Sequence, residues 1–276
     1  MTTHLRADRA VFRFSGPDAH KLLNDVVTGP IPDSGDMASW WALLSPQGKV
    51  LAEGLAGWAN DALWLDVHQS VADDFFKRMK MYRLRANVVI DDLRLSHRVG
   101  WAIDEEPAGV VHGDRFSAVD IGWRTIDTAD EAKGWVPDDT EYARVRIETG
   151  IAQLGQDFPP DTVFAHDIGM DLLDGIDFAK GCYVGQEVVS RMKHRGTARR
   201  RPVIVHGVEA EAGAPILADG RDSGFVGRSV DGVAVGIVRM DRFGDGVVAT
   251  VGGKPVEFER PVWAEYEFGE GAGEDA

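Results

Sequence analysis

The sequence contains a single cysteine, Cys182, among its 276 residues. A lone cysteine excludes an internal disulfide, and it leaves too few thiolates for a Cys-rich metal or iron–sulfur site held by this chain alone. Such sequences are typical of a reducing compartment. The opening residues, MTTHLRADRA, lack the apolar stretch of a secretory signal. From these absences we expect a cytoplasmic protein.

Long apolar runs and the common catalytic motifs are also missing. No window approaches the ~20 apolar residues that a membrane-spanning helix needs, so we expect no membrane partner. The sequence has no G-x-x-x-x-G-K-[ST] phosphate loop, no G-x-G-x-x-G after a strand, no G-x-S-x-G and no H-E-x-x-H. The usual nucleotide-dependent and hydrolytic enzyme classes are therefore disfavoured.

Glycine and proline are plentiful, with 32 and 12 residues, and 44% of the chain is hydrophobic. That content is ample for a buried core, while the many turn residues indicate short elements. A mixed α+β class with antiparallel sheet is favoured over a helical bundle.

Charge is distributed unevenly along the chain. The formal net charge is −15, which argues against nucleic-acid binding through the whole surface. Two segments are nevertheless basic, and together they suggest a defined binding site for an anionic ligand. Residues 77–98 contain Lys77, Arg78, Lys80, Arg83, Arg85, Arg94 and Arg98 against Asp91 and Asp92; residues 180–201 contain Lys180, Arg191, Lys193, Arg195, Arg199, Arg200 and Arg201 against Glu187.

Alternation and turn signals predict the order of elements. Helices are expected after Ser15, after Ser70 and over Glu141–Thr149, and 153–180 is expected to be largely loop. Early strands are expected at Val11–Phe14, Trp40–Leu44, Val50–Trp58, Ala62–Val67 and Ala86–Ile90. Six short strands after Arg201 predict a compact β-barrel: Pro202–His206, Ala214–Leu217, Gly224–Val230, Val233–Met240, Val247–Val251 and Val256–Phe258.

These elements predict a division of the chain into parts. We expect an N-terminal α+β domain over 1–95, completed by about 140–200, and a small α+β subdomain over 96–139. The segment 140–200 bears the chemically interesting residues. A C-terminal β-barrel follows over 201–268, and 269–276 is expected to be a disordered acidic tail.

Cys182 lies in the polar segment KGCYVGQEVVSR. A lone cysteine is most often a small buried apolar residue. Here glycines on either side permit close backbone approach, and Lys180 is positioned to lower the pKa of the thiol, which would favour a nucleophile, a redox group or a single metal ligand.

Several other residues are candidates for binding. Glu148 could accept the donor pair of a pterin ring, or be a solvated acid on its helix. The basic run 193–201 could hold carboxylates, phosphates or RNA, or be a solvated linker. Convergent metal binding is not indicated by the acidic loop, whose members suit turns and caps. That loop contains His166, Asp167, Asp171, Asp174 and Asp177. Four aromatic side chains could either stack a flat ring or fill the core: Trp40, Trp41, Trp58 and Trp64.

With KGCYVGQEVVSRMKHRG in view, the chain resembles the YgfZ family, the folate-binding branch related to the glycine cleavage T-protein, an aminomethyltransferase. The family pattern K-G-C-Y-x-G-Q-E is matched at every fixed position from Lys180 to Glu187. Further family-like segments follow in the expected order and cover most of residues 10–200: FSGPDAHKLLNDVVTG, ALLSPQGKVLAEGL, RMKMYRLRANVVIDD and RIETGIAQLGQDF.

The resemblance implies a three-part T-protein-like α+β fold with a central folate channel and a C-terminal β-barrel. It implies tetrahydrofolate or a one-carbon derivative as ligand, and a role in assembling or maintaining iron–sulfur clusters in enzymes that include tRNA-modifying ones. Cys182 corresponds to the family's key functional residue. Glu148 takes the role of the pterin-binding glutamate in its R-x-E-x-G context, and the other implied folate contacts are Arg146, Lys180, Tyr183, Gln186 and Arg191.

Two departures from the related T-protein matter. Its early acidic pair, one member of which assists aminomethyl transfer, reads Ala52-Glu53 here. The stretch DTVFAHDIGMD also differs from the usual Pro-Glu-x-Gly-Leu-Asp form, although Asp171 keeps the final acid.

Three functions therefore stand side by side, and whether the protein is an enzyme is left open. The first is a tetrahydrofolate-binding accessory protein whose partners are iron–sulfur enzymes or cluster assembly proteins. The second is a folate-dependent one-carbon transferase or demethylase, and the third is a tRNA-binding module that uses the basic run 193–201.

Overall fold

The computed structural model describes residues 2–35, 37–116, 119–196 and 198–269. The chain divides into two compact units. Unit 1 comprises residues 1–45, 51–142 and 174–184, and unit 2 comprises 46–50, 143–173 and 185–276. The domain boundaries expected from the sequence remain predictions. Of the tail expected over 269–276, Gly269 is described, and its N–H donates to Met240 O at 3.0 Å; residues 270–276 lie outside the described residues.

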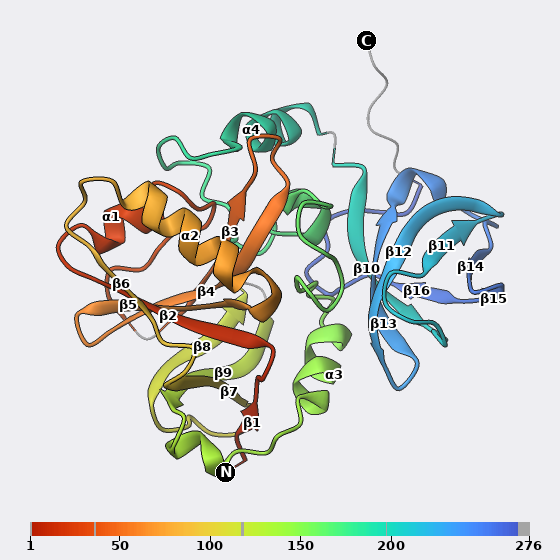
Figure 1. Cartoon of the computed structure of the whole chain (residues 1–276). Coiled ribbons are helices and arrows are strands. Elements are labelled where there is room, and N and C mark those ends of the chain that lie inside the picture. Colours follow the sequence, from red (N-terminus) through yellow and green to blue (C-terminus); the bar gives the residue numbers. More distant parts are fainter. Residues whose placement is uncertain (1, 36, 117–118, 197, 270–276) are drawn as a thin grey trace. The chain divides into compact units, whose positions relative to one another are not determined.

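Unit 1 is built on two antiparallel sheets (Figure 1). One sheet has the order β3-β4-β5-β2-β6, and the other has the order β1-β7-β9-β8. The first contains β3 (Ser39–Leu44), β4 (Val50–Ala59), β5 (Ala62–His68), β2 (Arg9–Ser15) and β6 (Val89–Asp92); the second contains β1 (His4–Leu5), β7 (His97–Ala102), β9 (Val119–Thr128) and β8 (Val110–Phe116).

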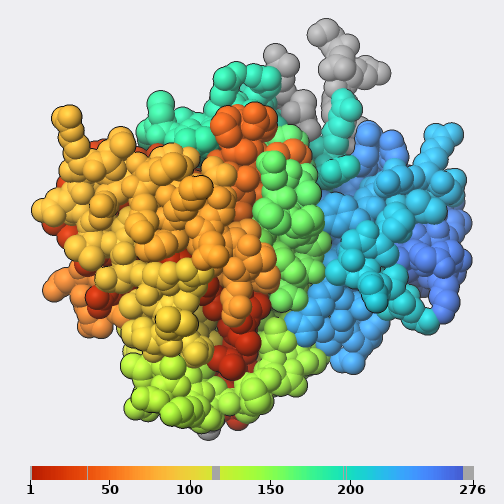
Figure 2. All heavy atoms as spheres, in the orientation of Figure 1, coloured from red at the N-terminus to blue at the C-terminus, as the bar shows by residue number. Residues whose placement is uncertain are grey.

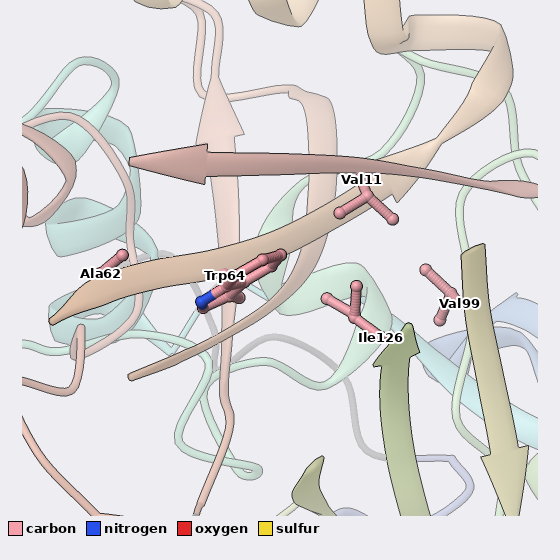
Figure 3. Packing of buried hydrophobic residues seen from close by; sticks show 5 residues of the cluster. All are labelled: Val11, Ala62, Trp64, Val99 and Ile126. Atoms are coloured by element: carbon pink, nitrogen blue, oxygen red, sulfur yellow. The ribbon is translucent and has the colours of Figure 1, made fainter. Parts of the chain in front are cut away.

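The alternating sequence VFRF in β2 explains how both faces of the first sheet are covered. Phe12 and Phe14 point to one face, where their rings lie 5.3 and 6.5 Å from that of Phe75 on α2 (Ala72–Arg83). Val11 points the other way, because successive strand side chains alternate. It packs in a cluster contributed by strands of both sheets (Figure 3): Val11, Ala62, Trp64, Val99 and Ile126. The remaining helical elements of unit 1 are α1 (Ala19–Asn24) and the 3₁₀ turns η1 (Gln69–Val71) and η2 (Glu131–Gly134).

Unit 2 contains an antiparallel seven-stranded sheet of order β15-β14-β11-β12-β13-β10-β16. The short strands expected after Arg201 are therefore present. They are β10 (Arg200–His206), β11 (Pro215–Ala218), β12 (Arg221–Val230), β13 (Val233–Arg239), β14 (Ala249–Val251), β15 (Lys254–Pro255) and β16 (Glu257–Glu259). Its helical elements are η3 (Ala165–Ile168), α4 (Gln186–Arg195) and η4 (Met240–Arg242), and α3 (Thr140–Glu148) begins in unit 1 and ends in unit 2.

Several local predictions need correction. Ser15 belongs to β2, and Asp18 precedes the first helix instead. The strand expected at Ala86–Ile90 lies three residues later, because the chain first makes a turn in which Ala86 N–H donates to Arg83 O at 2.7 Å. Helix α4 was not predicted at all, since its start follows Gly185, which has a φ of 84° and the sequence character of a loop.

Candidate functional site

Cys182 lies on a loop that is anchored to the Thr28-Gly29 turn of unit 1. Thr28 Oγ1 donates to Gly175 O at 2.7 Å, and Asp177 N–H donates to Thr28 O at 2.8 Å. Gly29 allows the turn to run against β3, because a Cβ there would lie 2.0 Å from Trp40 O. The base of the loop is therefore fixed by hydrogen bonds to a buried part of the unit.

Lys180 adds a third attachment. Its Nζ donates to Gly29 O at 2.7 Å and lies 5.4 Å from the centroid of the Tyr183 ring. Burial lowers the pKa of Lys180 to about 8, although Asp177 and Asp25 act in the opposite direction. Burial likewise raises the pKa of Tyr183 to about 12. Lys180 thus holds the loop through a backbone carbonyl and an aromatic face.

Cys182 is exposed in this arrangement, and the expectation that a lone cysteine is usually buried does not apply to it. A Cβ on the neighbouring Gly181 would meet no heavy atom within 4 Å. The loop is held at both sides of the thiol by Lys180 and the buried Tyr183. The sulfur is consequently open to a small molecule or to a second protein.

The other motif residues have different positions. Gln186 and Arg191 belong to α4 in unit 2, whereas Lys180, Cys182 and Tyr183 belong to unit 1. Arg191 makes an exposed i,i+4 ion pair with Glu187 at 2.5 Å. The motif therefore spans a unit boundary, which its eight contiguous letters did not reveal.

The segment RIETG in unit 2 contains one exposed acid and two structural residues. Glu148 is exposed at the end of α3 and lies 3.9 Å from Arg144. Arg146 is fully buried, and its Nη1 and Nη2 donate to Asp157 at 2.5 and 3.3 Å. Gly150 has a φ of 73°, and a Cβ there would lie 2.4 Å from Pro261 Cγ. Only Glu148 in this segment presents a carboxylate to solvent.

A buried ionic network in unit 1 was not anticipated. Asp66 accepts from Arg9 Nε at 2.6 Å and from Arg124 Nη1 at 2.7 Å. Burial opposes ionisation of Asp66, but the two guanidinium groups outweigh it and lower the pKa. Glu53, the remaining member of the early acidic pair, accepts from Trp40 Nε1 at 2.9 Å and from Arg9 at 3.4 Å. The partners lie tens of residues apart, so only the fold brings them together.

The basic run 193–201 is partly occupied by internal contacts. Arg201 donates to both carboxylate oxygens of Asp171, at 2.7 and 3.0 Å. Both residues line a cavity of about 270 Å³ in unit 2, together with Lys193 and Arg199. Acids share this lining, including Glu265 and Glu267, so the cavity is mixed in charge.

Residues of the acidic loop serve its local structure. Asp167 is buried, accepts from Phe164 N–H at 3.0 Å, and has a pKa that burial raises. Asp177 Oδ1 accepts from Ala179 N–H at 2.8 Å, and Asp174 has a φ of 53°. Among the described residues no group of three His, Cys, Asp or Glu could hold a metal ion.

Most of the tryptophans that could stack a flat ring or fill the core lie in the core. Trp40, Trp41 and Trp64 are buried, and Trp58 is partly buried. Within the ranges that the structure describes, no helix has both the length and the apolar character to cross a membrane.

Comparisons with known proteins relate the chain to a defined group. Residues 198–266 match the family model of the CAF17 C-terminal β-barrel domain. The iron-sulfur cluster assembly factor IBA57 homolog, mitochondrial, of Mycosarcoma maydis is 30% identical over 71% of this chain and 54% of its own length. The mitochondrial IBA57 factor of Mus musculus is 27% identical over 84% of this chain and 76% of its own length. The chain spans about half the length of the first curated relatives that it matches.

The fold comparison is equally clear. The glycine cleavage system aminomethyltransferase T of Bartonella henselae superimposes with a TM-score of 0.73 at 15% identity, covering 97% of this chain and 87% of that one. The expected T-protein-like α+β fold with a C-terminal β-barrel is thus confirmed. The similarity is to CAF17 and IBA57 proteins and does not single out YgfZ.

One expectation is wrong. We expected a cytoplasmic protein from the absence of a signal sequence and the single cysteine. The IBA57 relatives from fungi, mouse and human are all named as mitochondrial, which overturns that expectation. Cysteine content reports redox conditions, and several compartments share them.

Proposed function

We propose that this protein is a tetrahydrofolate-binding accessory factor for the assembly or maintenance of iron–sulfur clusters, and that Cys182 is its functional thiol. The observation that carries the proposal is the exposed Cys182 on a loop fixed to unit 1 by Lys180 and Thr28. Similarity to proteins named as iron–sulfur cluster assembly factors supports the cluster part. The aminomethyltransferase-like fold supports the folate part.

The thiol acts in this proposal as a transient ligand or attachment point. One cysteine cannot hold a cluster alone, so client enzymes or assembly proteins contribute the remaining ligands. An exposed sulfur on an anchored loop can act as such a transient ligand, because a partner protein can reach the sulfur while the loop keeps its position. A buried cysteine would need local unfolding first.

In the folate part of the proposal Glu148 accepts the pterin donor pair, because it is the exposed carboxylate of the RIETG segment. Arg146 supports that segment from within through Asp157. Lys180, Tyr183, Gln186 and Arg191 remain predicted folate contacts. Aminomethyl transfer is not included, because Ala52 occupies one position of the acidic pair and Glu53 is bonded to Arg9 and Trp40. A tRNA-binding function is not favoured, since acids share the cavity at the basic run.

Titration calorimetry with tetrahydrofolate tests the folate part. We expect one binding site in the wild-type protein and at least about tenfold weaker binding in Glu148→Ala, because one bidentate charge-assisted contact is lost. Glu141→Ala is the matched control, since Glu141 is a similarly exposed carboxylate on the same helix. Absence of binding to the wild type would refute the folate assignment. Equal affinity of both variants would remove Glu148 from it.

A further inference from the structure

Unit 1 carries a basic and apolar surface that neither the thiol nor the folate proposal uses. It is formed by the end of α2 and the turn that follows, and its residues are exposed. Figure 2 shows atoms of this part of the chain, coloured orange to yellow, on the molecular surface. We name it the Leu84 surface, and it consists of Lys77, Lys80, Met81, Arg83, Leu84 and Arg85.

Helical spacing groups these side chains. Lys77, Lys80 and Met81 follow the i, i+3, i+4 pattern that places residues on one face of a helix, and Leu84 comes directly after the end of α2. The opposite face carries Phe75 and Met79, which are buried. Met81 is 54% exposed and Leu84 is 87% exposed. Two large apolar side chains therefore point to solvent in the middle of a cationic face.

The positive charges of this surface are only partly compensated within the chain. The neighbouring acids are engaged elsewhere: Asp74 binds Arg78 at 2.7 Å, and Asp73 and Asp92 bind Arg94 at 2.6 and 2.5 Å. In the part of the chain that the structure describes, Lys77, Lys80, Arg83 and Arg85 form no ion pair. Lys80 Nζ lies 4.4 Å from the centroid of the Phe76 ring, and its charge adds to the effect of Arg94 in lowering the pKa of Asp92. Four positive charges grouped on a protein of net charge −15 attract acidic groups to this surface rather than to the rest of the chain.

Leu84 is also held in a strained backbone conformation. Its φ is 43° and its ψ is −106°, a combination outside the regions that residues with a Cβ populate. The turn is fixed from both sides, by the Ala86 N–H bond to Arg83 O at 2.7 Å and the Asn87 N–H bond to Asp18 Oδ2 at 2.7 Å. Strain of this kind clusters at binding sites, and no burial of the leucine offsets it here.

We propose that the Leu84 surface is the docking site of an acidic protein, which seats Leu84 and Met81 in an apolar pocket rimmed by carboxylates. Hydrophobic anchors surrounded by complementary charge are the usual construction of such interfaces. RNA is disfavoured, because a leucine and a methionine offer nothing to phosphates and the rest of the chain repels them. A membrane surface is disfavoured because two apolar side chains are a small anchor and the net charge opposes anionic lipid. This inference does not depend on folate binding or on the thiol.

The first experiment is cross-linking in the native host with p-benzoyl-L-phenylalanine in place of Met81 in the full chain. Val262, which is 86% exposed in unit 2, receives the same group as the control position. We expect a discrete protein adduct from position 81 and none from position 262, and we expect Arg83→Glu with Arg85→Glu to abolish it. No adduct, equal yield at both positions, or an adduct to RNA or lipid would overturn the proposal.

The second experiment uses the adduct's partner after purification. Binding to wild type should weaken at least tenfold in the Arg83→Glu, Arg85→Glu variant and should fall steeply with salt. Leu84→Gly should also weaken binding, by about fivefold or more, while its melting temperature stays equal to or above that of the wild type, because glycine accepts a positive φ. Wild-type affinity in either variant, or a partner surface without acidic residues, would overturn the proposal.

Discussion

The buried ion pair between Arg146 and Asp157 should be the most sensitive point of unit 2. Asp157 is a hub that joins three segments: it accepts from Arg146, from Gln153 N–H at 2.7 Å and from Arg228 N–H at 3.2 Å. Both side chains of the pair are almost fully buried, at 1% and 0% exposure. Asp157→Asn preserves the volume but removes the charge and replaces one acceptor by a donor.

We expect Asp157→Asn to lower the free energy of unfolding by about 3–5 kcal/mol, the range for a buried pair that loses one partner. The buried guanidinium is then unpaired, and at least one backbone N–H loses its acceptor. Adding Arg146→Met should restore part of the loss, because the uncompensated charge is removed. Asp241→Asn is the control, since its Arg239 pair in the same unit is partly exposed and should be worth no more than about 1 kcal/mol.

Urea unfolding, followed by tryptophan fluorescence and by circular dichroism, measures these differences. A loss below about 1 kcal/mol in Asp157→Asn would refute the reasoning, as would a double variant less stable than the single one. Confirmation would assign Arg146 a supporting role beneath Glu148. Arg146, the arginine of the R-x-E-x-G pattern, would then influence folate binding only by holding the segment that carries Glu148 in place.

Three further predictions concern the loop and the glycines. Ellman's reagent should modify one thiol per native chain at a rate within about tenfold of free cysteine, because Cys182 is exposed; a requirement for denaturant would contradict this. Gly150→Ala should lower the melting temperature by several degrees, because Gly150 has a positive φ and Pro261 occupies the position that a Cβ would take. Gly181→Ala is the control and should shift the melting temperature by about a degree or less, since a Cβ there meets no atom. Equal shifts in the two variants would refute the packing argument. Because the pKa of Lys180 in the folded protein is lowered to about 8, the unfolded chain binds more protons than the folded chain between pH 8 and 10. The free energy of unfolding of the wild type should therefore rise with pH in this range relative to that of Lys180→Gln. Parallel pH profiles of the two proteins would contradict the burial of the amine.

Local patterns in the sequence were sufficient for much of the fold. The alternation in VFRF predicted the strand that became β2, and the closely spaced strands after Arg201 predicted the sheet of unit 2. The helix α4 was missed because it begins at a glycine with a positive φ inside a segment dominated by polar motif letters. Helix start signals rely on a capping side chain, and none is present there.

The candidate site was predictable only where the residues are contiguous. The resemblance identified Cys182, and its flanking glycines predicted close backbone approach. The structure instead exposes Cys182, and a Cβ on Gly181 would meet no heavy atom within 4 Å. Lys180 was expected to act on the thiol or on an anion, but its amine is bonded to the Gly29 carbonyl, a partner 151 residues away. The network of Arg9, Asp66 and Arg124 likewise depends on long-range pairing that no local pattern encodes.

The functional claim rests most directly on the thiol in cells. The measurement is the activity of iron–sulfur enzymes in a strain that lacks this gene and carries either wild-type protein or Cys182→Ala at equal abundance. Our account predicts that the wild-type protein restores activity and that Cys182→Ala leaves it near the level of the empty strain. Full restoration by Cys182→Ala would contradict the account.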